Sequence, residues 1–286
     1  MLGKLNLARK WRVVMTGVCF LTFLCGGLIL TVTALPLILL LSATPAQRER
    51  RTLLLIHYAF KFFMRYMQML NPISSFQVHG LEHVSSRKGA LFIANHPTLI
   101  DVVAIMSSLP NCQCIVKKSL LQNVYFGRLL QAAGYVAHDS SEFMAECAQR
   151  LHAGFSLLIF PEGTRSPLEG LQRFSRGAAQ IALRTGAAVV PVAVTCEPPT
   201  LHKGDPWYTV PSRPIDLTLR FFPSLEIPTA VTEKKHLPLQ ARALTSYWEN
   251  FFRQELHMAK SSALDPSEEN ISEAAGTPLP IGGPLQ

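Results

Sequence analysis

Three signatures that would assign a chemistry are missing from this chain of 286 residues. There is no G-x-S-x-G turn to expose a serine nucleophile, since the stretch Gly154-Phe155-Ser156-Leu157-Leu158 lacks the final glycine. There is also no P-loop, and no glycine fingerprint of a dinucleotide-binding fold opens a helix. The sequence therefore favours neither a nucleotide-dependent enzyme nor an acyl-enzyme formed on serine.

Patterns for metal and nucleic-acid binding are missing as well. The six cysteines include one pair, Cys112 and Cys114, but no second pair at zinc-site spacing, so we interpret them as reduced thiols of a cytosol-facing protein. The formal charge of +8 is accompanied by no zinc-finger spacing and no RNA-binding aromatic signature. We therefore expect no metal, no cofactor and no nucleic-acid partner, and an anionic phospholipid surface as the basic chain's partner.

Charge itself is missing from a run of 35 residues, from Val13 to Gln47. The run is too long for the core of a signal peptide, and one membrane-spanning helix needs only about 20 apolar residues. Basic residues flank it on both sides, and a re-entrant hairpin would keep both flanks cytoplasmic, whereas a single span would not. With Gly26-Gly27 near the middle and Pro36 in the second half, we expect a membrane-embedded hairpin in preference to one tilted span.

Residues 52–70 continue this membrane-directed pattern. Polar side chains recur at helical spacing from His57 to Gln68, and aromatic and apolar residues fill much of the rest. A basic, aromatic amphipathic helix is typical of the headgroup plane of a bilayer, although a helix packed on the protein core is the alternative. Residues 1–72 are thus predicted to form a membrane anchor and interfacial helix at the inner (cytoplasmic) membrane, with the rest of the chain facing the cytoplasm.

Further along, short apolar runs alternate with helical patterns. The runs expected as strands are 77–80, 90–94, 112–116, 134–137, 155–160 and 187–195. Asp139 and Glu142 have capping-box spacing and predict the start of a helix, and the alternating run 215–222 predicts an antiparallel edge strand. We therefore expect residues 73–260 to form an α/β domain with a largely parallel sheet flanked by helices, and residues 261–286 to form a disordered tail.

A base and a carboxylate, His96 and Asp101, lie where a buried strand gives way to a helix. Five positions apart on one helix they would not meet, so the pair works only if His96 precedes the helix and Asp101 lies in its first turn. Asp101 could then accept the imidazole Nδ1–H and leave Nε2 as a general base. Without an enzyme nucleophile, such a base would activate a hydroxyl of the substrate.

A second polar loop, Phe160–Ser166, follows another buried strand, where open α/β sheets bind ligands. Gly163 permits close approach of the backbone, and Arg165 suits a phosphate or a carboxylate. Arg176 precedes the next helix, and a helix N-terminus attracts anions.

These two loops resemble blocks of the glycerolipid acyltransferase family, which includes the bacterial 1-acylglycerol-3-phosphate acyltransferases. Asn95–Asp101 is similar to its N-H-x4-D block and Phe160–Ser166 to its F-P-E-G-T-R-S block, while Phe174–Ala178 and Val189–Val192 resemble two shorter ones. The resemblance implies transfer of an acyl chain from acyl-CoA or acyl carrier protein to a lysolipid hydroxyl at a phospholipid membrane. It implies His96 as the base, Asp101 as its orienting partner, and acceptor binding by Glu162, Gly163, Thr164 and Arg165.

One departure from the family concerns the acceptor. Members that act on phosphate-bearing acceptors often carry G-x-x-x-x-[DN]-R, and in the similar run Gly134–Ser140 a serine replaces the arginine, with His138 as a partial substitute. The chain also resembles acyltransferases of aryl-polyene and other specialised lipid pathways. The acceptor is therefore expected to be 1-acylglycerol-3-phosphate-like, or alternatively a non-phosphate lyso-aminolipid or aryl-polyene lipid. A non-catalytic lipid-binding or assembly protein and a lipid hydrolase are the alternatives from other classes.

Overall fold

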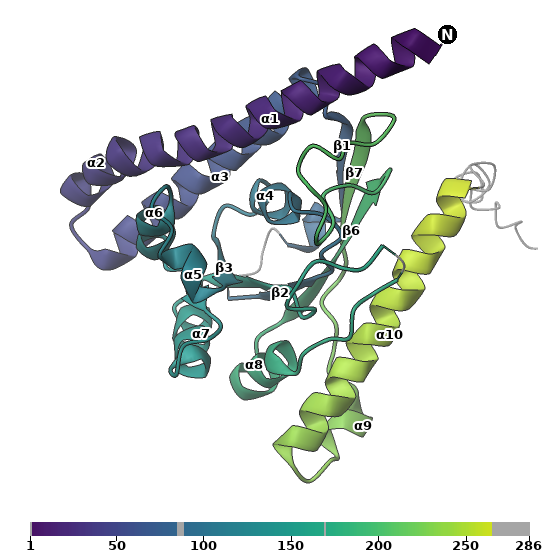
Figure 1. The fold of residues 1–286 in the computed structure, drawn as a ribbon. Helices are drawn as coiled ribbons and strands as arrows, with labels where there is room; N and C mark the ends of the chain where they lie inside the picture. Colours follow the sequence, from purple (N-terminus) through teal and green to yellow (C-terminus); the bar gives the residue numbers. More distant parts are fainter. Residues whose placement is uncertain (1, 85–88, 169, 265–286) are drawn as a thin grey trace, which may run out of the picture.

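The computed structural model describes residues 2–84, 89–168 and 170–264 (Figure 1). In chain order the elements are α1 (Leu2–Val32), α2 (Ala34–Leu41), α3 (Pro45–Met69), β1 (Ile73–His79), η1 (Leu81–His83), β2 (Leu91–Ala94), α4 (Asp101–Met106), β3 (Cys112–Val116), α5 (Lys118–Leu121), α6 (Gly127–Ala132), β4 (Val136–Ala137), α7 (Phe143–His152), β5 (Ser156–Ile159), α8 (Gly177–Thr185), β6 (Val189–Glu197), β7 (Ile215–Phe221), α9 (Thr229–Thr232) and α10 (Leu237–Leu264).

The centre of the fold is a seven-stranded sheet in the order β1-β7-β6-β2-β5-β3-β4. Every neighbouring pair is parallel except β6 and β7, so the expected α/β class with a largely parallel sheet is confirmed. The expected antiparallel strand is β7, but its placement at the edge is wrong. β1 pairs with β7 from Ile73 opposite Ile215 to His79 opposite Arg220 and covers that edge.

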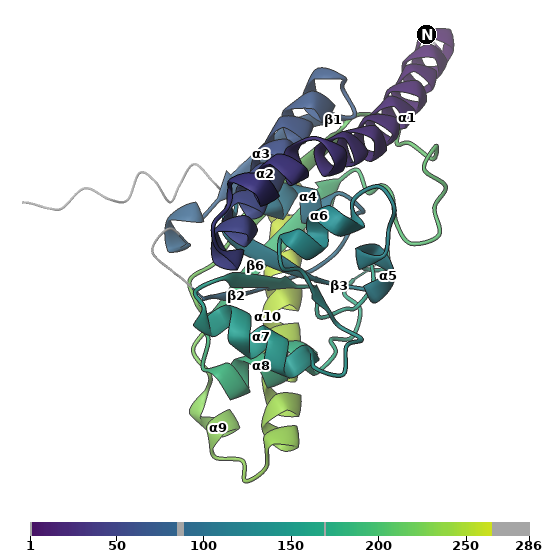
Figure 2. The same cartoon turned by 90° about the vertical axis from the view of Figure 1, so that its left-hand side faces the viewer.

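Helices cover both faces of this sheet (Figure 2). The period of two along β2 divides its buried side chains between the layers: Phe92 and Ala94 join the core under α3, α4 and α6, whereas Leu91 and Ile93 join the core under α7, α8 and α10. Because both faces are covered, the four residues of β2 are all buried, as expected for a central parallel strand.

The apolar N-terminal run is one helical rod, interrupted only at Thr33 between α1 and α2. The stretch Leu7–Leu41 is long and apolar enough to cross a membrane, and only 11% of its most apolar window is buried within the protein. The hairpin expected with Gly26-Gly27 near its middle is not formed, because this pair lies within α1, and the chain reverses only near the end of the uncharged run, between Leu41 and Pro45 (Figure 1). Glycine lowers helix propensity without breaking the backbone hydrogen bonds, so the pair does not end the helix.

Helix α3 packs one face on the core, which favours the alternative interpretation of this segment. Five of its apolar residues, among them Ile56 and Met64, belong to the core next to α4. His57, expected on an exposed polar stripe, is buried, and its Nδ1 lies 3.0 Å from the carbonyl oxygen of Met106. The opposite face still exposes Tyr58 and Phe62.

Helix α10 continues past residue 261, where the expected tail begins, and residues 265–286 lie outside the described residues. The boundary between anchor and α/β domain, expected at residue 72, stays a prediction.

A substitution at Trp248 on α10 tests the core under α7, α8 and α10 directly. Its side chain is 1% exposed, so Trp248→Ala should lower the free energy of unfolding by about 3–5 kcal/mol through lost burial and a residual cavity. Denaturant unfolding in a neutral detergent measures the change. The neighbouring Tyr247→Ala, at a position that is 39% exposed, should cost less than half as much, and equal losses would contradict this assignment of the core.

Candidate active site

The site lies at the carboxyl ends of β2 and β5, where the two polar loops leave the sheet. The first loop is fixed at its start by Asn95, whose side-chain amide donates to the carbonyl of Val194 and accepts from its N–H, both at 2.8 Å. These two hydrogen bonds attach the side chain of Asn95 to the backbone of β6, just beyond the end of β2. They set the direction in which the chain leaves β2 at His96. Open parallel sheets bind ligands at this edge.

His96 and Asp101 meet as the spacing predicted. His96 lies in the loop before α4, Asp101 is the first residue of α4, and 2.9 Å separates the imidazole Nδ1 from the carboxylate Oδ2. The backbone N–H of Thr98 donates to the same oxygen at 2.8 Å, and the ring of Phe160 stacks on the imidazole at 4.3 Å between centroids. With Nδ1–H donated to Asp101, Nε2 is left as the basic nitrogen.

Asp101 is fully buried, and burial raises the pKa of its carboxyl group from 3.8 to about 6. The hydrogen bond from His96 and the charge of its imidazole oppose this shift, and the N–H of Thr98 adds to that opposition. The second oxygen, Oδ1, has no partner among the described residues, which fits a carboxylate whose charge is only partly compensated.

Glu162 holds the two loops together and is absent from the wall of the large cavity described below. Its Oε1 accepts from the backbone N–H of His96 at 3.0 Å and from the hydroxyl of Ser166 at 2.6 Å, and its Oε2 accepts from the N–H of Gln172 at 2.9 Å. The N–H of Ser166 in turn donates to the carbonyl of His96 at 2.7 Å. Burial raises the pKa of Glu162, and these three hydrogen bonds lower it. We therefore interpret Glu162 as a residue that positions His96, and its expected contact with the acceptor stays a prediction.

A cavity of about 1510 Å³ opens beside His96. Most of its wall is apolar and comes from α1, α3, α4 and α6, with Phe23, Phe63 and Leu129 as examples. Gly163, Thr164 and Arg165 line its polar part, as does His96. The cavity thus joins a mostly apolar space to the imidazole of His96.

Arg165 has a partner that the sequence did not indicate. Its Nη1 donates to the carbonyls of Leu201 and His202, at 2.6 and 2.9 Å, and so fixes the segment 198–214 that joins β6 to β7. Gly163 has a positive φ of 66°, a conformation that favours glycine, and this turn brings the backbone of the loop to the cavity wall.

The remaining expected residues are placed differently. Arg176 is the exposed N-cap of α8 and is absent from the cavity wall, although its neighbour Gly177 contributes to it. His138 lines the cavity, whereas Ser140 does not, and the hydroxyl of Ser140 accepts from the N–H of Glu142. The structure therefore assembles His96, Asp101, Glu162 and residues 163–165, but not Arg176.

Two cavity residues were missed. Phe160 was named only as a strand end and as the first residue of the second polar loop, with no role of its own, and Arg12 was only one of the basic residues that flank the uncharged run. Both line the cavity together with His96. The F-P at the end of β5 was a usable signal for Phe160, because an aromatic ring before the loop can cover an imidazole. No sequence signal places Arg12, since its contact with Ser212 spans 200 residues.

Comparison with known proteins identifies relatives of this chain. Residues 75–195 match the family model described as Acyltransferase. A 1-acyl-sn-glycerol-3-phosphate acyltransferase from Cocos nucifera is 30% identical over 218 residues, 73% of this chain and 66% of that protein. The protein of the same name from Pseudomonas aeruginosa is 29% identical over 125 residues, 41% of this chain and 48% of that protein. The chain thus spans two thirds or less of the length of these curated relatives.

A solved structure shares the fold. The crystal structure of the 1-acyl-sn-glycerophosphate (LPA) acyltransferase PlsC from Thermotoga maritima superposes with a TM-score of 0.66 at 18% identity, covering 88% of this chain and 98% of that one. The match includes part of the segment before β1, because the covered share exceeds the residues from β1 to the last residue of the sequence.

The substitution Glu162→Gln tests whether the carboxylate of Glu162 holds the two polar loops together. An amide offers one acceptor oxygen in place of two, so at least one buried N–H or O–H donor loses its partner, and the free energy of unfolding should fall by about 1–3 kcal/mol. The change is read from denaturant midpoints. Glu142→Gln on the protein surface is the matched control and should leave the midpoint unchanged; if both variants behave alike, Glu162 does not hold the loops.

Proposed function

The chain belongs to the glycerolipid acyltransferase family, and on that premise we propose that it is a membrane-bound O-acyltransferase. It moves an acyl chain from a thioester, carried by CoA or acyl carrier protein, to the free hydroxyl of a lysolipid that resembles 1-acylglycerol 3-phosphate. The observation that carries the proposal is the His96–Asp101 contact of 2.9 Å beside a large cavity whose wall is mostly apolar.

The reaction follows from the donors and acceptors in place. Nε2 of His96 takes the proton of the acceptor hydroxyl while the hydroxyl oxygen attacks the thioester carbonyl carbon. Asp101 stabilises the imidazolium that forms. The tetrahedral intermediate collapses, the carbon–sulfur bond breaks, and the imidazolium returns the proton to the leaving thiolate. No enzyme nucleophile is required, and the ester product and free thiol balance the reaction.

Membrane attachment is part of the proposal. α1 exposes a row of large apolar side chains, including Leu7, Trp11 and Leu21, and Leu7–Leu41 has the length and composition of a span. The apolar cavity is walled by the same helix, so an acyl chain could pass from a bilayer to His96 without crossing water. We place the α/β domain on the cytoplasmic side of the inner membrane, where acyl thioesters are made available.

The proposal is tested with purified full-length protein in detergent, a radiolabelled acyl thioester and a panel of lysolipids with and without phosphate. New ester is identified by thin-layer chromatography and mass spectrometry. A labelled diacyl product formed from at least one lysolipid is expected, and absence of ester with every acceptor and with both donors would contradict the proposed function.

Changes to the base and its partner should slow turnover strongly while preserving the fold. His96→Ala removes the base, and Asp101→Asn presents an amide N–H to the imidazole, which favours the wrong tautomer. Each should lower kcat by about 10²–10⁴. Initial rates together with circular dichroism measure this effect. His79→Ala, which changes an exposed histidine, serves as control and should retain full activity.

The decline of kcat/KM at acidic pH should reflect the buried pair of His96 and Asp101. Because burial raises the pKa of Asp101 to about 6, the carboxylate gains a proton as the pH falls through 6, and the imidazole then loses its anionic partner. kcat/KM should therefore decline below pH 6, while an exposed aspartate would stay ionised down to about pH 4. A flat profile between pH 6.5 and 4.5, with the protein still folded, would be inconsistent with this role.

A further inference from the structure

The large exposed apolar residues of α1 lie in a row on one face of the helix. They recur three, four or seven positions apart, as side chains on one helical face do, and they include Leu7, Trp11, Val14, Leu21 and Leu28. Exposed apolar surface of this extent marks a site of interaction, and the proposed membrane attachment gives it the bilayer as partner. The opposite side of the same helix contacts the α/β domain.

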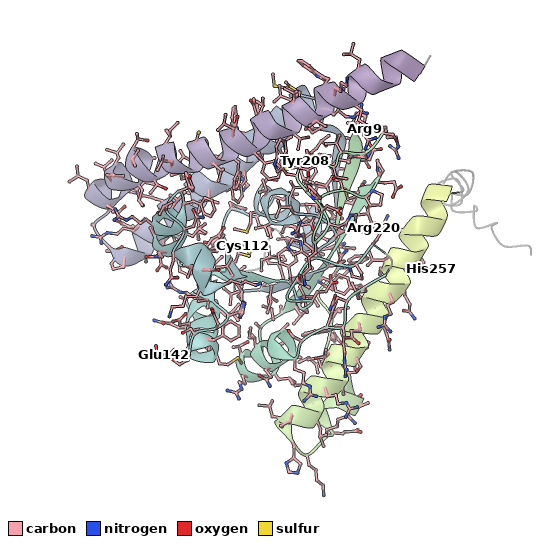
Figure 3. The ribbon with its side chains drawn as sticks, in the orientation of Figure 1. Arg9, Cys112, Glu142, Tyr208, Arg220 and His257 are labelled. Atoms are coloured by element: carbon pink, nitrogen blue, oxygen red, sulfur yellow. The ribbon has the colours of Figure 1, made fainter. Side chains whose placement is uncertain are left out.

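The loop between β6 and β7 reaches the edge of this row near the start of α1. Trp207 covers Gly17, because a Cβ atom placed there would lie 3.1 Å from the indole ring. Val14 and Leu21 are three and four positions from Gly17, so these two members of the row are its neighbours on the helix surface. Trp207 and Tyr208 stay exposed, and Tyr208 lies next to α1 in the view with side chains (Figure 3). We call this exposed pair the first tip.

The connection between α5 and α6 reaches the same row near the end of α1. The hydroxyl of Thr31 donates to the carbonyl of Tyr125 at 3.0 Å, and Leu28, a member of the row, is three positions from Thr31 on the helix surface. Val124 is 80% exposed and Tyr125 is 40% exposed, although both are adjacent to a helix that could bury them. We call Val124 and Tyr125 the second tip.

Basic residues border both tips. Lys203 is exposed four positions before the first tip, and Asp205, the acidic residue of that loop, lies 3.3 Å from the imidazole of His202. The segment 117–128 around the second tip holds three exposed basic residues and no acidic one. A bilayer of acidic phospholipid presents apolar chains beneath anionic headgroups, which matches an apolar or aromatic pair bordered by lysine and arginine.

We propose that both tips dock on the surface of an anionic phospholipid bilayer, so that the α/β domain contacts the membrane directly beside α1. The inference rests on the membrane attachment in the proposed function and extends it to two connections of the α/β domain. Tryptophan and tyrosine favour the boundary between headgroups and acyl chains, because each has an apolar ring and a polar group. Since α1 meets the tips at both Gly17 and Thr31, docking places this helix along the bilayer surface with its exposed row toward the lipid.

Docking of the first tip also brings the cavity wall to the membrane. The loop that carries this tip contributes Leu201, Val210 and Pro211 to the wall of the cavity that His96 lines. Arg165 holds the same loop through the carbonyl of Leu201. The loop therefore has one side in the cavity and an exposed aromatic pair for the bilayer.

The three tryptophans of the chain test the first tip. Trp11 belongs to the exposed row, Trp207 to the first tip, and Trp248 is buried in the core under α7, α8 and α10. Full-length variants that keep one tryptophan each, with phenylalanine at the other two positions, are reconstituted with phosphatidylglycerol vesicles whose acyl chains are brominated or unmodified. Bromine quenches only a tryptophan close to it, so Trp11 and Trp207 should lose several times more fluorescence than Trp248.

An introduced tryptophan tests the second tip. Val124→Trp is made in a chain whose three native tryptophans are replaced by phenylalanine. Leu239→Trp in the same chain is the matched control, because Leu239 is also an exposed apolar residue and lies at the start of α10, at the opposite end of the molecule from α1 in both views (Figures 1 and 2). Brominated lipid should quench the variant Val124→Trp and leave Leu239→Trp bright.

The outcomes separate this proposal from the proposed function. If Trp11 is quenched and Trp207 is not, the membrane attachment stands, docking of the first tip is wrong, and a protein partner or a second copy is left as the occupant. Equal quenching of Val124→Trp and Leu239→Trp overturns docking of the second tip. If vesicles float without the protein, the attachment itself fails. Circular dichroism checks the fold of each variant, and if Trp248→Phe unfolds the chain, the difference in quenching between wild type and Trp207→Phe decides for the first tip.

Discussion

The structure depends on two buried carboxylates that are held at one edge of a parallel sheet. Asp101 accepts from the imidazole of His96 and from the N–H of Thr98, and Glu162 accepts from the backbone of the same histidine. Burying each carboxylate is unfavourable, and hydrogen bonds compensate for part of this cost. Asp101 accepts them from its own loop, and Glu162 accepts them from both loops. His96 is thereby fixed at both its side chain and its main chain, which gives the pre-organisation that a general base requires.

A cavity lies beside His96, and both the α/β domain and the N-terminal helices contribute to its wall. α1 and α3 contribute apolar side chains to the cavity, and the segment 198–214 closes it toward α1. The apolar helices α1 and α3 therefore form part of the wall of the cavity that His96 also lines.

Much of this could be predicted from local sequence. The central strands are short apolar runs between polar breaks, and the strand Cys112–Val116 was predicted with the bounds that it has. The contact of His96 with Asp101 was predictable because residues five positions apart do not meet on one helix. They can meet at a strand-to-helix junction when the first precedes the helix and the second lies in its first turn. The family assignment, made from two sequence blocks, is confirmed by the comparisons.

The errors share one cause, which is that distant contacts decide what local spacing leaves open. β1 covers the edge of β7 through pairing across more than 130 residues, which the alternation of β7 could not reveal. Asp139 has the spacing of a cap, yet it accepts from the N–H of Lys118 and α7 begins only at Phe143. The family resemblance implied that Glu162 binds the acceptor; its oxygens accept from the backbone N–H groups of His96 and Gln172, and its contact with the acceptor stays a prediction.

Direct attack by the acceptor on the thioester, with His96 as its base, is the central claim, and the stoichiometry of thiol release tests it most directly. A thiol-reactive dye follows free thiol from an acyl thioester, while intact-protein mass spectrometry monitors acyl adducts in the same rapid-quench samples. The account predicts thiol release only when a lysolipid acceptor is present, one ester per thiol, and no acylated protein at any time. Thiol released without acceptor, together with free fatty acid or an acyl adduct on the protein, would contradict it.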